Sequence, residues 1–185
     1  MATWIKMQEL YKKILETIGE DVKRDGLKKT PERAAKTFRY LTNGYKKDLN
    51  KITNNSIFQS DIKDLILIKK IKIYSICEHH LLPFLGYCHI GYIPNGKILG
   101  ISKIVEIIEC YSRRLQIQER LTTEIANYIS YILQAKGVGV MIEAKHLCIE
   151  MREFKKQNPY ITTLSMTDEI KNKPYKRNEF LTLIK

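Results

Sequence analysis

Residues 77–80 read Cys-Glu-His-His and place a thiol, a carboxylate and two imidazoles side by side within an otherwise apolar stretch. Cys77 and His80 have the C-x-x-H spacing with which one turn can wrap two ligands around a zinc ion. Two ligands do not complete a tetrahedral site, so we expect a third from elsewhere in the chain. Residues 146–148, His-Leu-Cys, offer a second imidazole beside a second thiol.

A site made of Cys77, His80 and Cys148 would have three protein ligands and an open fourth position, which is the arrangement of catalytic rather than structural zinc. Zinc brings the pKa of a bound water near ~7 and so supplies hydroxide at neutral pH. His79 and His146 are then left to transfer protons. The competing interpretation is a chance or purely structural C-x-x-H pair, which the distant His-Leu-Cys segment disfavours.

The four cysteines admit a second interpretation, because four thiols can form two disulfides. In a cytosolic chain of this size, free thiols or metal ligands are the expected state. Cys88 and Cys110 fall on a predicted strand and a predicted helix, and we expect both to be buried thiols.

The 185 residues suffice for one well-buried domain, or for one domain with a small helical appendage. No apolar run reaches the ~18 residues of a membrane span, and the N-terminus lacks a secretory signal pattern, so a cytosolic protein without a membrane partner is expected. The net charge of +12 indicates an acidic partner such as a nucleic acid or a nucleoside triphosphate. The lysines are dispersed, without a basic stripe or aromatic platform, so nucleic acid is not the predicted partner.

Apolar periodicity predicts a helix from Met7 to Ile18 with one buried face. A second helix should start with Thr30 as its N-cap and Pro31 in its first turn. Residues 49–61 are interpreted as a connecting loop.

The remainder alternates between strand and helix patterns. Strands are predicted at 65–76, 87–93, 138–148 and 161–164, and helices from Ser102, over 121–132 and over 179–184. This order predicts an α+β fold with a mostly antiparallel sheet.

Seven segments of the chain carry specific motifs. They are Thr-Pro-Glu-Arg-Ala-Ala-Lys at 30–36, Cys-Glu-His-His-Leu-Leu-Pro-Phe at 77–84, Gly-Tyr-Ile-Pro at 91–94, Leu-Gly-Ile-Ser-Lys at 99–103, Tyr-Ser-Arg-Arg-Leu-Gln-Ile-Gln-Glu-Arg-Leu-Thr at 111–122, Glu-Ala-Lys-His-Leu-Cys at 143–148 and Glu-Phe-Leu-Thr-Leu-Ile at 179–184. In this order and spacing, the chain resembles GTP cyclohydrolase I over nearly its whole length.

The resemblance implies a tunnelling fold, in which sheets of several subunits close a barrel with helices on one face of the sheet. It implies a decamer of two pentamers with active sites at subunit interfaces. The expected reaction is hydrolysis of GTP to 7,8-dihydroneopterin triphosphate and formate, the first step of folate or tetrahydrobiopterin biosynthesis. We expect an N-terminal helical hairpin and connecting loop at 1–60 and the catalytic domain at 61–185.

By the same resemblance, the zinc ligands are Cys77, His80 and Cys148. His146 should protonate the purine ring nitrogen, and His79 should support the hydrated intermediate. Glu78 is expected to orient a ligand or the substrate by a hydrogen bond.

Ser102 opens a helix whose free N–H groups favour oxygen ligands, and it matches the ribose contact. Lys103 and Arg152 match triphosphate-binding positions. Gln118 and Glu119 match the guanine-reading pair, since a carboxylate accepts from N1 and the exocyclic amine. Without the resemblance, Ser102 would read as a plain N-cap and Glu119 as a surface charge.

Three departures from the family pattern avoid the expected zinc ligands and both histidines. Glu106 stands where many members have an arginine of the triphosphate environment, and it could pair with Lys103 at i,i+3. Glu153 replaces a usual glycine, and Thr167-Asp168 replaces a usual Leu-Gly. We expect altered substrate binding with the chemistry intact.

Two alternative functions remain open from the sequence. One is a zinc hydrolase of the same fold that stops after opening the purine or takes another nucleotide. The other is a non-catalytic, zinc-stabilised interaction module, for which His146 would be dispensable.

Overall fold

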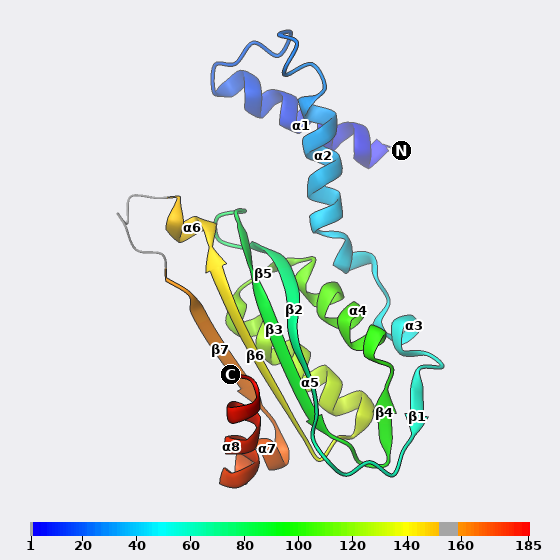
Figure 1. The fold of residues 1–185 in the computed structure, drawn as a ribbon. Helices are drawn as coiled ribbons and strands as arrows, with labels where there is room; N and C mark the ends of the chain where they lie inside the picture. The colour runs from blue at the N-terminus through cyan, green and yellow to red at the C-terminus, as the bar shows by residue number, and fades with distance from the viewer. Residues whose placement is uncertain (1, 152–158) are drawn as a thin grey trace. The chain divides into compact units, whose positions relative to one another are not determined.

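The computed structural model describes residues 2–151 and 159–185, and Figure 1 draws it as a ribbon. Contacts divide the chain into two compact units, Met1–Asn43 and Gly44–Lys185. Residues 44–60 group with the larger unit, and the functional division at residue 60 stays a prediction. None of the described helices is long and apolar enough to cross a membrane.

The smaller unit consists of two helices, α1 (Ala2–Thr17) and α2 (Thr30–Leu41), which pack against each other. The predicted first helix is therefore confirmed. Its apolar side chains are only partly covered, because Leu10 is 52% exposed and Ile14 is 54% exposed. The prediction that this helix buries one face is therefore wrong for a single chain.

The start of α2 differs by one residue from the prediction. Thr30 is the first helical residue, and Lys29 holds the N-cap position. The Thr30 hydroxyl donates to the carbonyl oxygen of Gly26 at 3.2 Å instead of capping the helix. Pro31 lies in the first turn as predicted, where its missing N–H removes no helical hydrogen bond.

The larger unit contains a curved five-stranded sheet and a separate two-stranded sheet. Its elements are η1 (Asn43–Lys46), α3 (Leu49–Thr53), β1 (Ile57–Gln59), β2 (Ile66–Cys77), β3 (Pro83–Ile93), β4 (Lys97–Leu99), α4 (Ile101–Ser112), β5 (Leu115–Gln116), α5 (Gln118–Leu133), β6 (Gly137–His146), α6 (Leu147–Glu150), β7 (Ile161–Met166), α7 (Asp168–Asn172) and α8 (Pro174–Leu183). The strand order is β5-β2-β3-β6-β7, and all neighbours are antiparallel except the short β2–β5 pair. The predicted α+β class with a mostly antiparallel sheet is confirmed.

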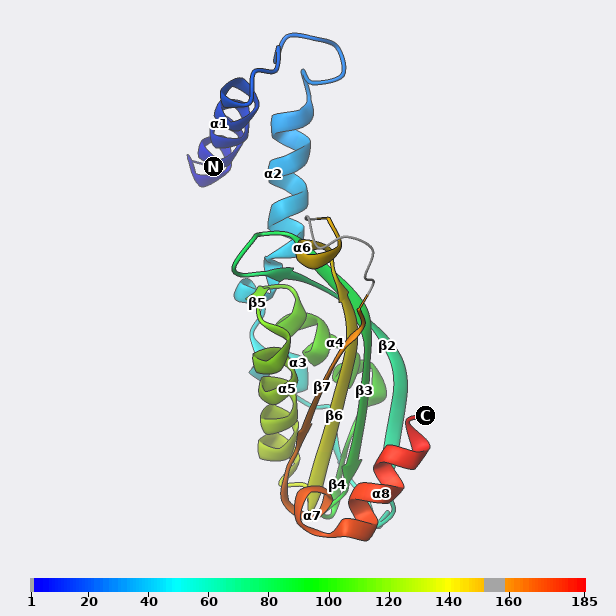
Figure 2. The same cartoon turned by 90° about the vertical axis from the view of Figure 1, so that its left-hand side faces the viewer.

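Helices α4 and α5 cover one face of this sheet, as expected (Figure 2). Alternate strand residues such as Ile73, Ile90 and Val140 point to that face and pack with Ile104 of α4 and Ile125 of α5. Each fully buried side chain of this kind contributes roughly 1.5–3 kcal/mol to folding. The apolar residues at alternate strand positions and those on one face of α4 and α5 thus form one hydrophobic core.

The C-terminal helices lie on the opposite face, so the expectation of helices on one face only is wrong (Figure 2). The buried ring of Phe180 on α8 lies over the sheet at Gly91 and Gly139. A β-carbon at either glycine would come within 3.0 Å of the Phe180 ring. Glycine at these two positions lets the aromatic ring approach the strands.

The segment predicted as a loop at 49–61 contains two short elements. In α3, the Asp48 carboxylate caps the helix by accepting from the N–H of Asn50 at 2.9 Å. Strand β1 pairs antiparallel with β4. Elements of three to five residues are too short for a periodic signal, so the prediction missed them.

Buried His89 on β3 should make the fold sensitive to acid. It is 5% exposed, and its Nδ1 has no hydrogen-bond partner among the described residues. Burial lowers the pKa of His89; the Glu143 carboxylate, 4.0 Å from Nε2, opposes this shift, and Lys69 and Lys70 reinforce it. Below pH ~6.5 the unfolded histidine takes up a proton that the folded one resists, so the free energy of unfolding should fall with acidification.

The expected slope from this one proton is at most about 1.4 kcal/mol per pH unit. Denaturant titrations between pH 7 and pH 5 measure it, with His89→Asn as the comparison. The variant should lose that part of the slope. Parallel pH profiles for the two proteins would contradict the prediction.

Candidate metal and catalytic site

A tight turn between β2 and β3 shapes the first half of the site. The Cys77 N–H donates to the carbonyl oxygen of Leu82 at 2.8 Å, and the Leu81 N–H donates back to the Cys77 carbonyl at 2.9 Å. Leu81 adopts φ +55, which lets the chain reverse within this turn. As a result, His80 folds back over the end of β2, and its Nδ1 lies 3.7 Å from the Cys77 sulfur.

Cys148 completes the group from the other side of β3. The predicted strand at 138–148 is too long, because β6 ends at His146 and Cys148 lies in the short helix α6. The ligand atoms of Cys77, His80 and Cys148 all lie within 4.8 Å of one another. The fold therefore brings together the three residues that the sequence singled out as metal ligands.

The donor set and spacing of this group fit a zinc ion. Ligands at the usual Zn–S and Zn–N distances of a tetrahedral site lie roughly 3.5 Å from each other, close to the 3.7 Å between Cys77 and His80. Both thiols are buried, at 6% and 7% exposure, whereas His80 is exposed. Two thiols and an imidazole suit zinc better than hard cations such as Mg²⁺ or Ca²⁺, which prefer oxygen.

His146 lies at the end of β6, beside the group formed by Cys77, His80 and Cys148 (the metal group). Two contacts hold its ring. Its ring stacks on Phe84, with centroids 4.6 Å apart and planes 2° from parallel, because these residues are paired in the β3–β6 register. Its Nε2 lies 2.8 Å from Oε1 of Gln118. Burial lowers the pKa of His146, and the nearby Glu119 carboxylate partly opposes that shift.

Glu78 connects the turn at residues 77–82 (the metal turn) to helix α5. Its Oε2 accepts a hydrogen bond from Nη2 of Arg120, and its Oε1 lies 4.0 Å from Nε2 of His79. Arg120 is itself fixed by donating to Gln116 Oε1 at 2.9 Å and to the Leu115 carbonyl at 3.0 Å. The hydrogen bond and charge of Arg120 hold the pKa of Glu78 below its usual value, so the carboxylate is ionised.

No role was predicted from the sequence for Arg120 or Gln116, although both lie within the motif at 111–122. A cavity of about 490 Å³ borders this network and is lined by Tyr45, Glu78, Arg114, Leu115, Gln116, Arg120 and Glu124. Helix α5 contacts the buried His146 directly through Gln118, whereas its Arg120 bonds to Glu78, which in turn lies near the exposed His79.

Ser102 and Lys103 lie elsewhere in the larger unit. They belong to the first turn of α4, directly after β4, and Figure 1 shows β4 near the end of the sheet opposite α6. The Leu99 N–H donates to the Tyr92 hydroxyl at 3.3 Å, and Tyr92 pairs with Val138 near the start of β6. From residue 138 to His146 the strand runs roughly 26 Å.

One chain therefore does not bring these two residues to the metal group. Arg152, the other expected triphosphate contact, and Glu153 lie outside the described residues.

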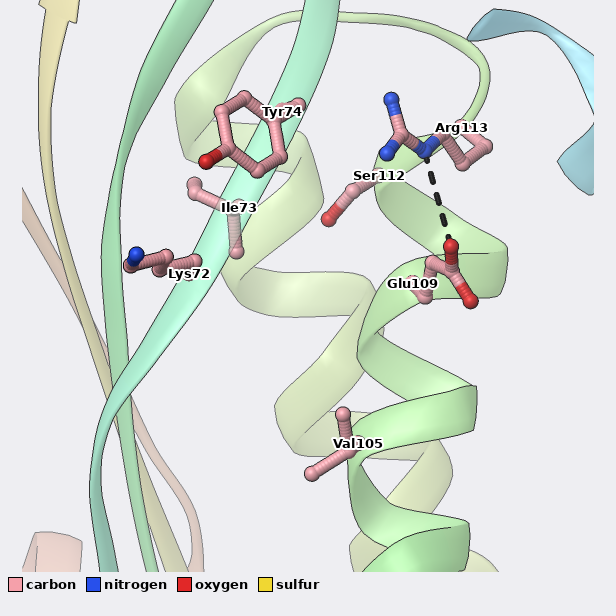
Figure 3. A pocket seen from close by; sticks show the side chains of 7 residues that line it. All are labelled: Lys72, Ile73, Tyr74, Val105, Glu109, Ser112 and Arg113. Carbon is pink, nitrogen blue, oxygen red and sulfur yellow. Dashed lines mark ion pairs between the residues drawn. The ribbon is translucent and has the colours of Figure 1, made fainter. Parts of the chain in front are cut away.

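A second pocket, of about 290 Å³, lies between β2 and α4 (Figure 3). Within it, the Glu109 carboxylate bridges two cations, lying 3.7 Å from Arg113 Nε and 3.0 Å from Lys47 Nζ. None of the predicted site residues lines this pocket. The Glu109 carboxylate is therefore neutralised by Arg113 and by Lys47, which lies outside the lining.

With the site geometry established, comparison with known proteins identifies the family. The sequence model of GTP cyclohydrolase I matches residues 7–185. The chain belongs to the GTP cyclohydrolase I family.

Several relatives are about half identical along almost the full length. GTP cyclohydrolase 1 of Methylococcus capsulatus is 51% identical over 178 residues, which cover 96% of each chain. The protein of the same name from Hahella chejuensis is 49% identical and covers 97% of this chain and 95% of its own. That of Pseudoalteromonas translucida is 51% identical and covers 97% and 98%.

Two of the departures from the GTP cyclohydrolase I pattern have a structural account. Glu106 forms the expected i,i+3 ion pair, with its Oε1 2.8 Å from Lys103 Nζ. Asp168 adopts φ +46, the left-handed region that favours glycine, and its carboxylate accepts from the Ser130 hydroxyl at 3.3 Å. Thr167 lies just before it and accepts from the Val138 N–H at 3.0 Å. This second departure lies at the β7–α7 junction, opposite the metal end of the sheet.

Proposed function

We propose that this protein is a zinc-dependent GTP cyclohydrolase I that converts GTP to 7,8-dihydroneopterin triphosphate and formate. One observation carries the proposal: a Cys-His-Cys metal group lies beside the buried His146 in a chain of this family. The product would enter folate or tetrahydrobiopterin biosynthesis. The proposed compartment is the cytosol, where thiols stay reduced and available to a metal.

Cys77, His80 and Cys148 would hold the zinc ion. Zinc bound by three protein ligands supplies a polarising Lewis acid and activates water at its open position near neutral pH. The turn 77–82 and helix α6 position these ligands before the ion arrives, because their backbone hydrogen bonds are made within the protein. The zinc affinity of the site should therefore depend on the fold of the larger unit.

His146 is the proposed proton donor to the purine ring nitrogen, and His79, on the exposed side of the turn, is the proposed second proton-transfer group. Glu119 is exposed at the start of α5 and close enough to His146 to influence its pKa. A carboxylate there can accept hydrogen bonds from guanine N1 and its exocyclic amine. In this proposal, guanine recognition by Glu119 lies next to the proton donor His146.

A complete site would need a second copy of the chain. Ser102 and Lys103 are proposed to contact the ribose and triphosphate, yet within one chain they lie near the far end of the sheet from His146. The sheet has edges to offer for such an assembly, since β7 has a partner strand only on its β6 side among the described residues. We propose a homo-oligomer, a decamer of two pentamers by family resemblance, with Arg152 also at the triphosphate.

Incubation of zinc-loaded protein with GTP, with and without a zinc chelator, tests this function. We expect formate release and, after oxidation, pterin fluorescence, both lost with the chelator. Accumulation of a formylated pyrimidine would instead support the hydrolase that stops early. Zinc-loaded protein with no turnover of GTP would contradict the proposal.

Glu78→Gln should reduce GTP turnover more than zinc content. Glutamine keeps the shape but loses the charge that pairs with Arg120 and faces His79. Disturbing a group that orients the metal turn typically costs 10- to 100-fold, and we expect about tenfold in kcat. Zinc per chain, measured by atomic absorption, should stay near that of the native protein. Parallel losses of zinc and activity would show that Glu78 acts through the metal alone.

Glu106→Gln should strengthen GTP binding. The change frees Lys103 from its 2.8 Å ion pair and removes a negative charge that repels a triphosphate. Exposed pairs of this kind contribute roughly 0.2–1 kcal/mol, so KM should fall by a factor of about 1.4 to 5 with kcat unchanged. Glu179→Gln breaks a similar i,i+3 pair with Lys176 on α8 and serves as the control. An unchanged or higher KM in Glu106→Gln would contradict the prediction.

A further inference from the structure

Gln118 has a side-chain amide that is wholly engaged inside the protein. It is the first residue of α5 and is 1% exposed. Its Nε2 lies 3.0 Å from the carbonyl oxygen of Ile142, 2.8 Å from that of Ile161 and 3.1 Å from the hydroxyl of Thr163. Its Oε1 faces Nε2 of His146 at 2.8 Å.

These contacts determine which atom of the Gln118 side-chain amide is the nitrogen and which is the oxygen. A carbonyl oxygen can only accept, so the end of the amide that faces Ile142 and Ile161 must be the NH₂ group. The oxygen therefore points at His146 and can only accept from it. The His146 Nε2 must carry a hydrogen to make this bond.

The hydroxyls around Gln118 agree with this orientation. Thr122 donates to the Gln118 backbone carbonyl at 2.7 Å, which uses its single proton. In the 2.6 Å contact between Thr122 and Thr163, the donor must then be Thr163. The Thr163 oxygen is left to accept, and it shares one of the two Gln118 amide hydrogens with a carbonyl oxygen.

We infer that Gln118 is a positioning residue that orients the His146 ring by accepting from its Nε2–H, so that Nδ1 is the nitrogen that takes up a proton from water and then donates it to the purine ring nitrogen during catalysis. Stacking on Phe84 fixes the plane of the His146 ring. The contact with Gln118 fixes the direction in which Nε2 points within that plane. The catalytic consequence rests on the proposed function, whereas the placement of the hydrogen does not.

This inference assigns Gln118 a different task from the guanine contact expected from the family resemblance. Its amide has no exposed donor or acceptor to offer a base, in contrast to the neighbouring Glu119, which is exposed. A guanine contact would act on GTP binding. A residue that orients the proton donor should act on kcat instead.

Nuclear magnetic resonance of the zinc-loaded protein with ¹⁵N-labelled histidine, recorded without GTP, tests the placement directly. We expect neutral His146 of the native protein to show a protonated Nε2 and an unprotonated Nδ1. The opposite tautomer in the native protein would overturn the inference without recourse to any variant. Because GTP is absent, this result is independent of whether the protein turns GTP over.

Steady-state kinetics of Gln118→Met and Thr163→Val test the consequence. Methionine fills the space without bonding to His146, so we expect mixed tautomers and kcat about 100-fold lower, with KM within about twofold. Thr163→Val leaves the two carbonyl contacts that orient Gln118 and should keep both the native tautomer and most of kcat. A Gln118→Met protein with a native tautomer, or with raised KM and normal kcat, would refute the assignment.

Discussion

Replacing Cys148 by serine should remove zinc from the protein and abolish GTP turnover. Cys148 is the one proposed ligand that comes from outside the β2–β3 turn, and without it two ligands remain. Even partners that only orient a ligand change metal affinity 10- to 100-fold, so loss of a ligand should exceed about 100-fold. Zinc per chain after dialysis and formate release from GTP measure the two effects.

Cys110→Ser is the matched control for this change. Cys110 is also buried, and its sulfur donates to the Gly44 carbonyl at 3.5 Å, a bond that a serine hydroxyl can retain. We expect this variant to keep zinc and activity. A Cys148→Ser protein that binds zinc as tightly as Cys110→Ser would exclude Cys148 from the metal site.

His146→Asn should abolish turnover and leave zinc in place. Asparagine approximates the size of the imidazole but cannot exchange a proton, and general acid–base groups contribute about 10²- to 10⁴-fold to rate. His146 is not one of the three ligand residues, so zinc per chain should match that of the native protein. His89→Asn, which changes a buried histidine remote from the metal turn, should retain activity. Normal turnover by His146→Asn would favour a non-catalytic, zinc-stabilised module.

The same variant can test whether two chains share a site. A double variant, Ser102→Ala with Lys103→Ala, should also be inactive if these groups bind the ribose and triphosphate. Mixed oligomers of the two inactive proteins should recover part of the activity, because some sites draw His146 from one chain and Ser102 and Lys103 from another. Absence of recovery in verified mixed oligomers would place all the groups of a site on one chain.

Much of this protein was determined by local sequence patterns. The C-x-x-H spacing of Cys77 and His80 places two ligands within one turn, where short backbone hydrogen bonds dictate the geometry. The alternation along β2 and the helical spacing of α4 and α5 identified the elements and their buried faces. These features could be predicted because each depends on residues a few positions apart.

Short or terminal features were less predictable. The elements α3 and β1 are too short to show a period, and the helix that carries Cys148 continues a strand pattern without a break. The spacing of apolar residues correctly predicted the helix α1. It did not predict that this apolar face is exposed, because spacing does not reveal what covers a face.

Only the tertiary structure decided how the catalytic side chains are held. The β3–β6 register stacks Phe84 on His146, and the packing of α5 against β6 and β7 brings Gln118 to the same ring and Arg120 to Glu78. The tertiary structure also separates Ser102 from the metal group by the length of β6. These relations join residues tens of positions apart, and their distances follow from strand register and helix placement, which no local period encodes.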